Sequence, residues 1–302
     1  GGAIYALSPI AVSNCMFQNN AARSGAGIYI LGTDGSSVVD CEFSQSYATS
    51  QAAGVMLNGA SNAIVEDCGF INNTTNRGSL YAFVSNGVEV IDCDFINNGP
   101  HPDSWGVSGF NNWNSTNIFM EGCLFQNLTG GNASSIYIDG RDTDEFQMTI
   151  NDCTFENNTT TSYGGTVYGW RADYEMNDCV FNSNEGPNAA AIYNGNTKAV
   201  INNTEFSTNS ANFGGATANY NEETDATYTD CTFFNNERKS LLPCNLITYH
   251  NTDMSCLILS VTMYAVLKIA KFCKIGWLLL INVVSTINMS IWNFLSFNAL
   301  PF

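Results

Sequence analysis

A ninefold repeat is the feature that most constrains this sequence of 302 residues. The tripeptide Cys-x-Phe recurs along the chain, once with Thr in place of Cys, and successive copies lie 25 to 30 residues apart. A unit of this length is too short for an independent domain, because it can bury its apolar side chains only against its neighbours. The repeat therefore predicts a coil of stacked units. Its phenylalanines are Phe17, Phe43, Phe70, Phe95, Phe125, Phe155, Phe181, Phe206 and Phe233.

The residues before each Cys predict a tight corner. The third position before it is always apolar, and the position directly before it is always Asn, Asp or Gly. Side chains alternate between the two faces of a strand, so a straight strand cannot place both apolar positions on one face. A bend at the Asn, Asp or Gly, which tolerate left-handed backbone, returns both to the interior. These corner residues are Asn14, Asp40, Asp67, Asp92, Gly122, Asp152, Asp178, Asn203 and Asp230.

A second corner follows the Phe, and a third strand follows that corner. Asn stands five residues after the Cys or Thr in seven repeats, and a small residue then leads an apolar pair, as in Gly27-Ile28-Tyr29. Three short strands per repeat, with no helical period, predict an all-β fold: a single-stranded right-handed parallel β-helix of about nine turns. We expect equivalent residues to stack about 4.8 Å apart. We expect the stacked asparagines to bond to one another and to corner backbone.

Composition divides the chain in two. Residues 1–237 contain 26 acidic and 5 basic residues, a net charge of −21, whereas residues 238–302 are apolar with a net charge of +4. Such a shift is typical of a boundary. We therefore expect a β-helix over 1–237 and an apolar tail over 238–302. The chain begins in the middle of a repeat, without Met, and we interpret residue 1 as a cut within a longer protein.

The tail has three interpretations. Residues 275–297 are uncharged and long enough to cross a bilayer, and three lysines precede them. Three asparagines within this segment weigh against insertion. The abrupt change in composition would equally follow from translation in a non-native reading frame. The third interpretation is an apolar cap, because an open end of a coil leaves strand edges and core exposed.

Two motifs carry a family resemblance. Gly-Gly-Ala-Ile at residues 1–4 and Phe-x-x-Asn, for example from Phe206 to Asn209, resemble the repeats of polymorphic outer membrane proteins. More broadly, residues 1–237 are similar to pectin-lyase-like right-handed β-helices. The first resemblance implies a surface adhesin, and the second implies a fold that also includes pectin-degrading enzymes. The Gly-His-Gly motif of polygalacturonase-like hydrolases is absent, since His101 stands between two prolines.

The cysteine column is interpreted as a stack of small buried side chains. The chain has 11 cysteines, an odd number, and no Cys-x-x-Cys pair of the kind that binds metal. In-register parallel neighbours are about 4.8 Å apart, which exceeds the Cβ separation of about 3.8 Å in a disulfide. Free buried Cys behaves as a small hydrophobe.

One acidic stretch is a candidate catalytic or Ca²⁺-binding site. Residues 139–145 read Asp-Gly-Arg-Asp-Thr-Asp-Glu and fall in one of the two 30-residue repeats, so we expect a protruding loop. The candidate catalytic residues are Asp139, Arg141, Asp142 and Asp144. Clustered oxygens could also hold Ca²⁺, with Asp142, Asp144 and Glu145 as ligands. The alternative is a solvated acidic loop.

The third strand predicts a binding surface. If Ile28 faces inward, Tyr29 faces outward by alternation, and a column of aromatic residues results, interrupted by Met56 and Ser108. Such a column could stack on sugar rings or on a protein partner, or it could simply stabilise the sheet. The candidate binding residues are Tyr29, Tyr81, Tyr137, Tyr168, Tyr193, Trp105 and Trp170.

These features favour a non-enzymatic, adhesin-like β-helix at the cell surface or in the extracellular space, binding a glycan or protein along its side. Membrane attachment through 275–297 is one version of this hypothesis. The alternative is a polysaccharide lyase or hydrolase acting on an acidic polysaccharide, although a charge of −21 would repel a polyuronate unless Ca²⁺ bridged the two. Nucleic acid is excluded as a partner, because so few basic residues cannot neutralise a run of phosphates. No cofactor other than Ca²⁺ is suggested.

Overall fold

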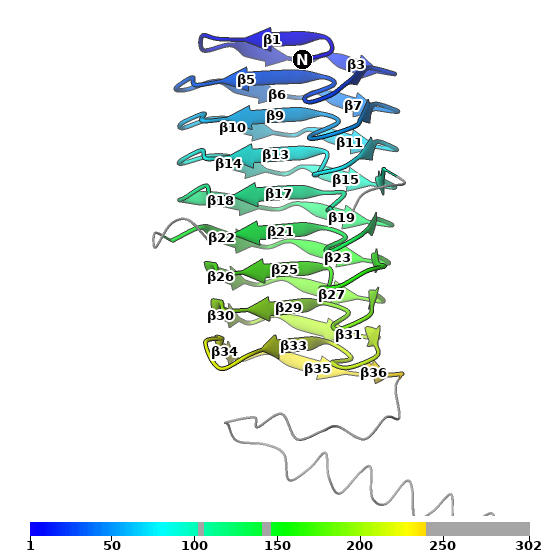
Figure 1. Cartoon of the computed structure of the whole chain (residues 1–302). Coiled ribbons are helices and arrows are strands. Elements are labelled where there is room, and N and C mark those ends of the chain that lie inside the picture. Colours follow the sequence, from blue (N-terminus) through cyan, green and yellow to red (C-terminus); the bar gives the residue numbers. More distant parts are fainter. Residues whose placement is uncertain (102–105, 141–145, 240–302) are drawn as a thin grey trace, which may run out of the picture. The chain divides into compact units, whose positions relative to one another are not determined.

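The computed structural model describes residues 1–101, 106–140 and 146–239. Within these ranges every regular element is a β-strand, and the strands coil through nine turns (Figure 1). The chain divides into two compact units, Gly1–Leu242 and Pro243–Phe302. The second unit, with the predicted membrane segment 275–297, lies outside the described residues. Over the ranges given above, the structure contains no helix of the length and apolarity that a membrane crossing requires.

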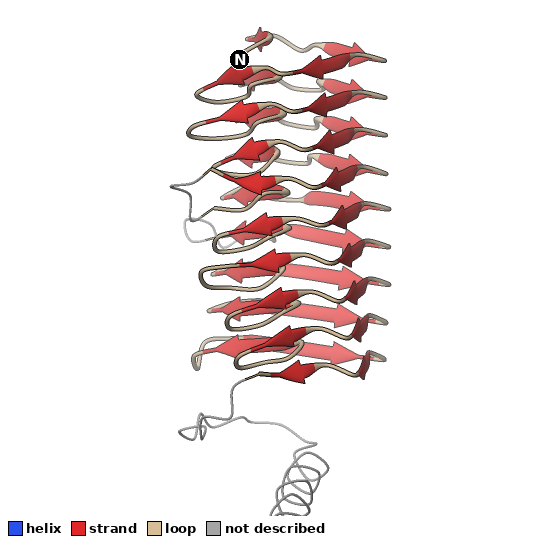
Figure 2. Cartoon of the chain, turned by 90° about the vertical axis from the view of Figure 1, so that its right-hand side faces the viewer, coloured by secondary structure: helices blue, strands red, loops and turns tan. Residues whose placement is uncertain are grey.

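Three nine-stranded parallel sheets, here called sheets A, B and C, form the walls of the coil. Each turn contributes one strand to each sheet, and Figure 2 shows the strands stacked turn upon turn. Sheet A contains β1 (Ile4–Ala6), β5 (Ile28–Leu31), β9 (Val55–Asn58), β13 (Leu80–Phe83), β17 (Phe110–Trp113), β21 (Ile136–Asp139), β25 (Val167–Trp170), β29 (Ile192–Gly195) and β33 (Thr217–Tyr220). Sheet B contains β2 (Ala11–Ser13), β6 (Ser37–Val39), β10 (Ile64–Glu66), β14 (Glu89–Ile91), β18 (Ile118–Glu121), β22 (Met148–Asn151), β26 (Asp173–Asn177), β30 (Lys198–Asn202) and β34 (Asp225–Thr229).

Sheet C carries the Phe of each repeat, and a two-residue strand follows it in every turn. These short strands form one sheet of four strands, β4 to β16, and one of five, β20 to β36, here together called the fourth ladder. The sequence predicted three strands per turn and missed this fourth one, because two residues are too few for alternation to show. Sheet C contains β3 (Met16–Gln18), β7 (Glu42–Ser44), β11 (Gly69–Ile71), β15 (Asp94–Ile96), β19 (Leu124–Gln126), β23 (Thr154–Glu156), β27 (Val180–Asn182), β31 (Glu205–Ser207) and β35 (Thr232–Phe234). The fourth ladder contains β4 (Ala21–Ala22), β8 (Tyr47–Ala48), β12 (Thr74–Thr75), β16 (Gly99–Pro100), β20 (Thr129–Gly130), β24 (Thr159–Thr160), β28 (Glu185–Gly186), β32 (Ser210–Ala211) and β36 (Glu237–Arg238).

The predicted corner between sheets B and C is confirmed. All nine Asn, Asp or Gly residues before the Cys position have left-handed backbone, with φ between 45° and 67°. The second corner also has a left-handed residue, but it lies one position earlier than the recurrent Asn, as at Asn157 beside Asn158. The recurrent Asn is instead buried in the interior in five of the seven turns, and it is half-buried at Asn20 and Asn236 near the two ends.

The predicted columns line the interior of the coil. Neighbouring rings of the nine phenylalanines are stacked, with centroids 4.4 to 5.2 Å apart and planes within 11° of each other. The seven rings from Phe43 to Phe206 are fully buried. The apolar positions of sheets A and B pack against them in one continuous cluster.

The buried asparagines form the predicted ladder. The Asn158 amide nitrogen donates to the Phe125 carbonyl of the preceding turn, and its Oδ1 accepts from the backbone N–H of Leu128, both at 2.9 Å. Asn73, Asn184 and Asn209 make the same pair of bonds in their own turns. The ladder thus links successive turns through hydrogen bonds that satisfy the buried amide.

The cysteine column consists of free thiols, as predicted: within the described ranges no disulfide forms and six of the eight cysteines are buried. The Cys153 sulfur donates to the carbonyl of Asn151 at 3.2 Å, and Thr204 makes the equivalent bond with its hydroxyl. Burial raises the pKa of the Cys41 and Cys153 thiols, because the thiolate would lose its hydration.

We predict a pH dependence from these thiols. An unfolded Cys loses its proton near its ordinary pKa of about 8.5, whereas the buried thiol keeps it. The free energy of unfolding should therefore be unaffected below that pH and fall as the pH rises above it. Alkylation with iodoacetamide at pH 8, mapped by mass spectrometry, should modify the exposed Cys15 and spare Cys153 until denaturant is added. Equal modification of Cys15 and Cys153 in the folded chain would contradict the burial of the Cys153 thiol.

Candidate functional site

The outer face of sheet A carries two parallel columns of side chains. The second residue of each strand forms one column and the fourth residue forms the other. The first column includes the predicted tyrosines, as alternation requires. It is interrupted by Met56, as predicted, and by Asn111, which pairs with Tyr81 and Tyr137. The prediction of Ser108 at that place is wrong, because the longer connection in this turn shifts the register by three residues.

Segments between the fourth ladder and sheet A cover part of this face. Tyr81, Tyr168 and Tyr193 are only 0%, 6% and 3% exposed, while Tyr29 and Tyr137 are half-buried. Ala52 lies with Tyr81 in one small apolar cluster, and a second cluster contains Val107, Ala133, Ala189, Tyr168 and Tyr193. The tyrosines thus form a largely covered layer whose accessible parts lie between the covering segments.

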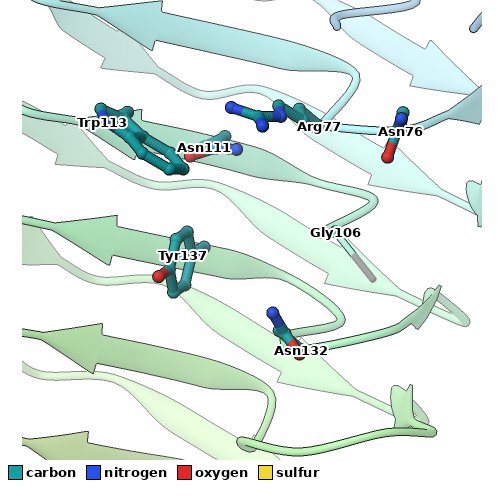
Figure 3. A pocket seen from close by; sticks show the side chains of 7 residues that line it. All are labelled: Asn76, Arg77, Gly106, Asn111, Trp113, Asn132 and Tyr137. Atoms are coloured by element: carbon teal, nitrogen blue, oxygen red, sulfur yellow. The ribbon is translucent and has the colours of Figure 1, made fainter. Parts of the chain in front are cut away.

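A hollow of about 220 Å³ lies between three of these segments (Figure 3). Its floor is formed by Asn111 and Trp113 of β17 and by Tyr137 of β21. Its rim comes from connections that precede β13, β17 and β21: Asn76 and Arg77 from the first, Gly106 from the second and Asn132 from the third.

The backbone positions Arg77 at this rim. Gly78 has a φ of +85°, and its N–H donates to the Val107 carbonyl at 2.8 Å. The Thr75 hydroxyl donates to the Gly78 carbonyl at 2.6 Å. A Cβ at Gly78 would lie 2.7 Å from the Leu80 carbonyl oxygen, so only glycine fits this turn. The short segment Thr75–Gly78 is therefore held at both ends, and Arg77 projects from it.

Aromatic rings and the Arg77 cation meet in the hollow. The Arg77 guanidinium carbon lies 4.8 Å from the centroid of the Trp113 ring, within range of a cation–π interaction. Trp113 and Tyr137 meet edge to face, with centroids 6.4 Å apart. The Tyr137 hydroxyl donates to Asp139 Oδ2 at 3.1 Å, which orients its ring. The floor is thus a fixed aromatic surface with a positive charge at one edge.

Two buried polar atoms at this place have no hydrogen-bond partner. They are Asn111 Oδ1 and the Tyr81 hydroxyl, in residues that are 2% and 0% exposed. Burial raises the pKa of Tyr81 to about 12, although the neighbouring Arg77 acts in the opposite direction. Tyr81 and Asn111, the residues that carry these two groups, are paired across adjacent strands. Such groups are rare in folded proteins and call for an explanation.

The other predicted site residues are distributed as follows. Trp170 is half-buried in the second column of sheet A, beside Asp139. Asp139 is fully buried at the end of β21. Trp105, Arg141, Asp142, Asp144 and Glu145 lie outside the described residues, so the proposed catalytic and Ca²⁺-binding roles stay predictions. In the part of the chain that is described, no cluster of three His, Cys, Asp or Glu side chains could hold a metal ion.

Sequence reasoning missed Arg77, Asn76, Asn111 and Asn132 as site residues. The available signals were Arg77, one of only five basic residues in residues 1–237, and the long connection before β17. Neither signal is specific, because the hollow exists only where three connections of different length meet the same face of sheet A.

A comparison with protein-family models agrees with the fold. Among curated proteins none matches this chain. A solved structure, that of QnrB1, described as a plasmid-mediated fluoroquinolone resistance protein, is similar over 74% of this chain and 92% of its own, with 10% identity and a TM-score of 0.24. The narrower resemblance to polymorphic outer membrane proteins is not confirmed. The family model described as "Right handed beta helix region" matches residues 3–181, more than half of the chain, and this chain therefore belongs to the right-handed β-helix family.

Proposed function

We propose that the coil is a non-enzymatic, adhesin-type module that binds a glycan on the outer face of sheet A, at a cell surface or in the extracellular space. The observation that carries this proposal is the hollow, in which Trp113 and Tyr137 lie beside amide side chains and Arg77. The apolar face of a sugar ring packs on an aromatic ring, while its hydroxyls bond to amide groups. The motif resemblance to polymorphic outer membrane proteins supports a surface location.

The size and rigidity of the hollow favour this class of ligand. Its volume of about 220 Å³ is below the roughly 300–1,000 Å³ of pockets for drug-sized molecules. It therefore suits one sugar ring of a longer chain. The floor residues stand on strands that are hydrogen-bonded on both sides, so little ordering is needed on binding. The remaining outer face of sheet A extends the surface along the stack of turns.

Replacement of Trp113 tests this function. The full chain should bind a subset of oligosaccharides on an array of neutral and acidic glycans, and Trp113→Ala should weaken binding by about 10- to 100-fold, because the ring supplies most of the contact area. Calorimetric titration of the strongest ligand measures the change. Tyr5→Ala is the matched control, since this exposed tyrosine belongs to the same face four strands away from β17 and outside the hollow, and it should leave binding unchanged.

Three outcomes would contradict the proposal. An array without any bound glycan would exclude glycan recognition. Binding that survives Trp113→Ala would place the site elsewhere. Release of shortened oligosaccharides from the bound ligand, detected by chromatography, would favour the alternative of a carbohydrate-active enzyme.

A further inference from the structure

We propose that the hollow selects a sugar residue that carries one carboxylate within an otherwise neutral glycan. This inference rests on the proposed function and specifies its ligand. It depends on three features of the described residues: the position of Arg77, the unsatisfied acceptor of Asn111, and the charge of the surrounding coil.

Arg77 is the anion-binding group of the hollow. Its guanidinium stacks over Trp113, and it is half-buried. Within residues 1–101, 106–140 and 146–239, no carboxylate lies at salt-bridge distance from it. Stacking occupies the face of the guanidinium, and the Tyr81 hydroxyl interacts with one of its donors. The remaining donors of the planar fork match a carboxylate. A carboxylate bound there would form two charge-assisted hydrogen bonds.

Asn111 defines the second requirement. Its Oδ1 is buried, has no hydrogen-bond partner and belongs to the floor of the hollow. Figure 3 shows Asn111 between Arg77 and Tyr137, on the same side of the strand as Trp113. An acceptor in this place requires a donor from the ligand, and a sugar hydroxyl supplies one. The ligand therefore presents a hydroxyl and a carboxylate on one ring, with an apolar face toward the aromatic floor.

The charge of the coil limits the ligand to a single anion. Residues 1–237 carry a net charge of −21, so a polyanion would be repelled along its whole length. The coil repels a single carboxylate in contact with Arg77 only weakly, because solvent ions screen charges beyond about 8 Å at physiological salt. A neutral glycan with one acidic sugar therefore places its carboxylate at the positive Arg77 and avoids repulsion by the net negative charge of the coil.

A matched pair of ligands tests the inference. The full chain is titrated at about 0.15 M salt with xylotetraose, with xylotetraose bearing one glucuronic acid, and with polygalacturonate. The singly charged ligand should bind about tenfold more tightly than its neutral counterpart, as expected for charge-assisted bonds, and more tightly per chain than polygalacturonate. Arg77→Gln should abolish the preference, so that the neutral and the singly charged ligand bind with equal affinity. Arg23→Gln, an exposed arginine of the equivalent connection before β5, should change neither.

The outcomes separate this inference from the function on which it rests. Equal affinity for the neutral and the charged ligand, or a preference that survives Arg77→Gln, would overturn the inference while glycan binding stands. Tighter binding of polygalacturonate would also overturn it. Failure of all three probes, together with an array that shows no bound glycan, would remove the proposed function itself.

Discussion

Phe155→Ala should lower the free energy of unfolding by about 3–5 kcal/mol, the range for removal of a buried phenyl ring. The Phe155 ring is fully buried and lies between two others, with centroids 5.0 Å from Phe125 and 4.4 Å from Phe181. The neighbouring turns are fixed by sheet hydrogen bonds, so they cannot collapse into the cavity. Urea denaturation followed by far-ultraviolet circular dichroism measures the change.

Phe233→Ala is the matched control for this prediction. Phe233 belongs to the same column but is 47% exposed in the last turn and stacks on Phe206 alone among the phenylalanines. Its loss should cost less than about 2 kcal/mol, since less apolar surface leaves water on folding. Equal effects of the two substitutions would mean that the phenyl column does not form the core.

Asn158→Leu should lower the free energy of unfolding by about 2–4 kcal/mol, because it leaves the buried Leu128 N–H without an acceptor and removes the bond to the Phe125 carbonyl. A leucine fits this position sterically, since Leu128 occupies the equivalent place one turn earlier and is fully buried. The decrease in the free energy of unfolding would therefore measure the lost hydrogen bonds and not a steric clash. The same urea denaturation measures it.

Asn177→Leu serves as the control for the buried ladder. Asn177 lies in an outward-facing row of asparagines on sheet B, where its amide bonds to Asn151 at 3.0 Å and it is half-buried. Solvent can replace these bonds, so the change should cost less than about 1 kcal/mol. If Asn177→Leu lowered the free energy of unfolding as much as Asn158→Leu, the buried asparagines would have no special role in joining the turns.

The interior could be predicted because every turn repeats the same arrangement of inward-facing side chains. The Phe, Cys and Asn columns recur at fixed offsets in nine, eight and seven turns, and the left-handed corner before each Cys position is always Asn, Asp or Gly, so the sequence supports each column many times. The two-residue fourth strand and the displacement of Asn158 from its corner escaped prediction. Both are local details too short to produce a period.

The hollow could not be predicted because it depends on the parts of the turns that do not repeat. Alternation correctly placed Tyr81 and Tyr168 on the outer face of sheet A, but it carries no information on what covers that face. Connections of unequal length bring Ala52 and Val107 over the tyrosines and leave a gap at β17. The same variation in length caused Ser108 to be predicted where Asn111 stands.

A crystal structure of the full chain with xylotetraose bearing one glucuronic acid tests the central claim most directly. Recognition of a glycan on sheet A predicts a sugar ring packed on Trp113, its carboxylate at the Arg77 guanidinium, and a hydroxyl within hydrogen-bond distance of Asn111 Oδ1. A ring bound instead against sheet B, sheet C or the acidic segment 139–145, with the hollow unchanged, would contradict the claim.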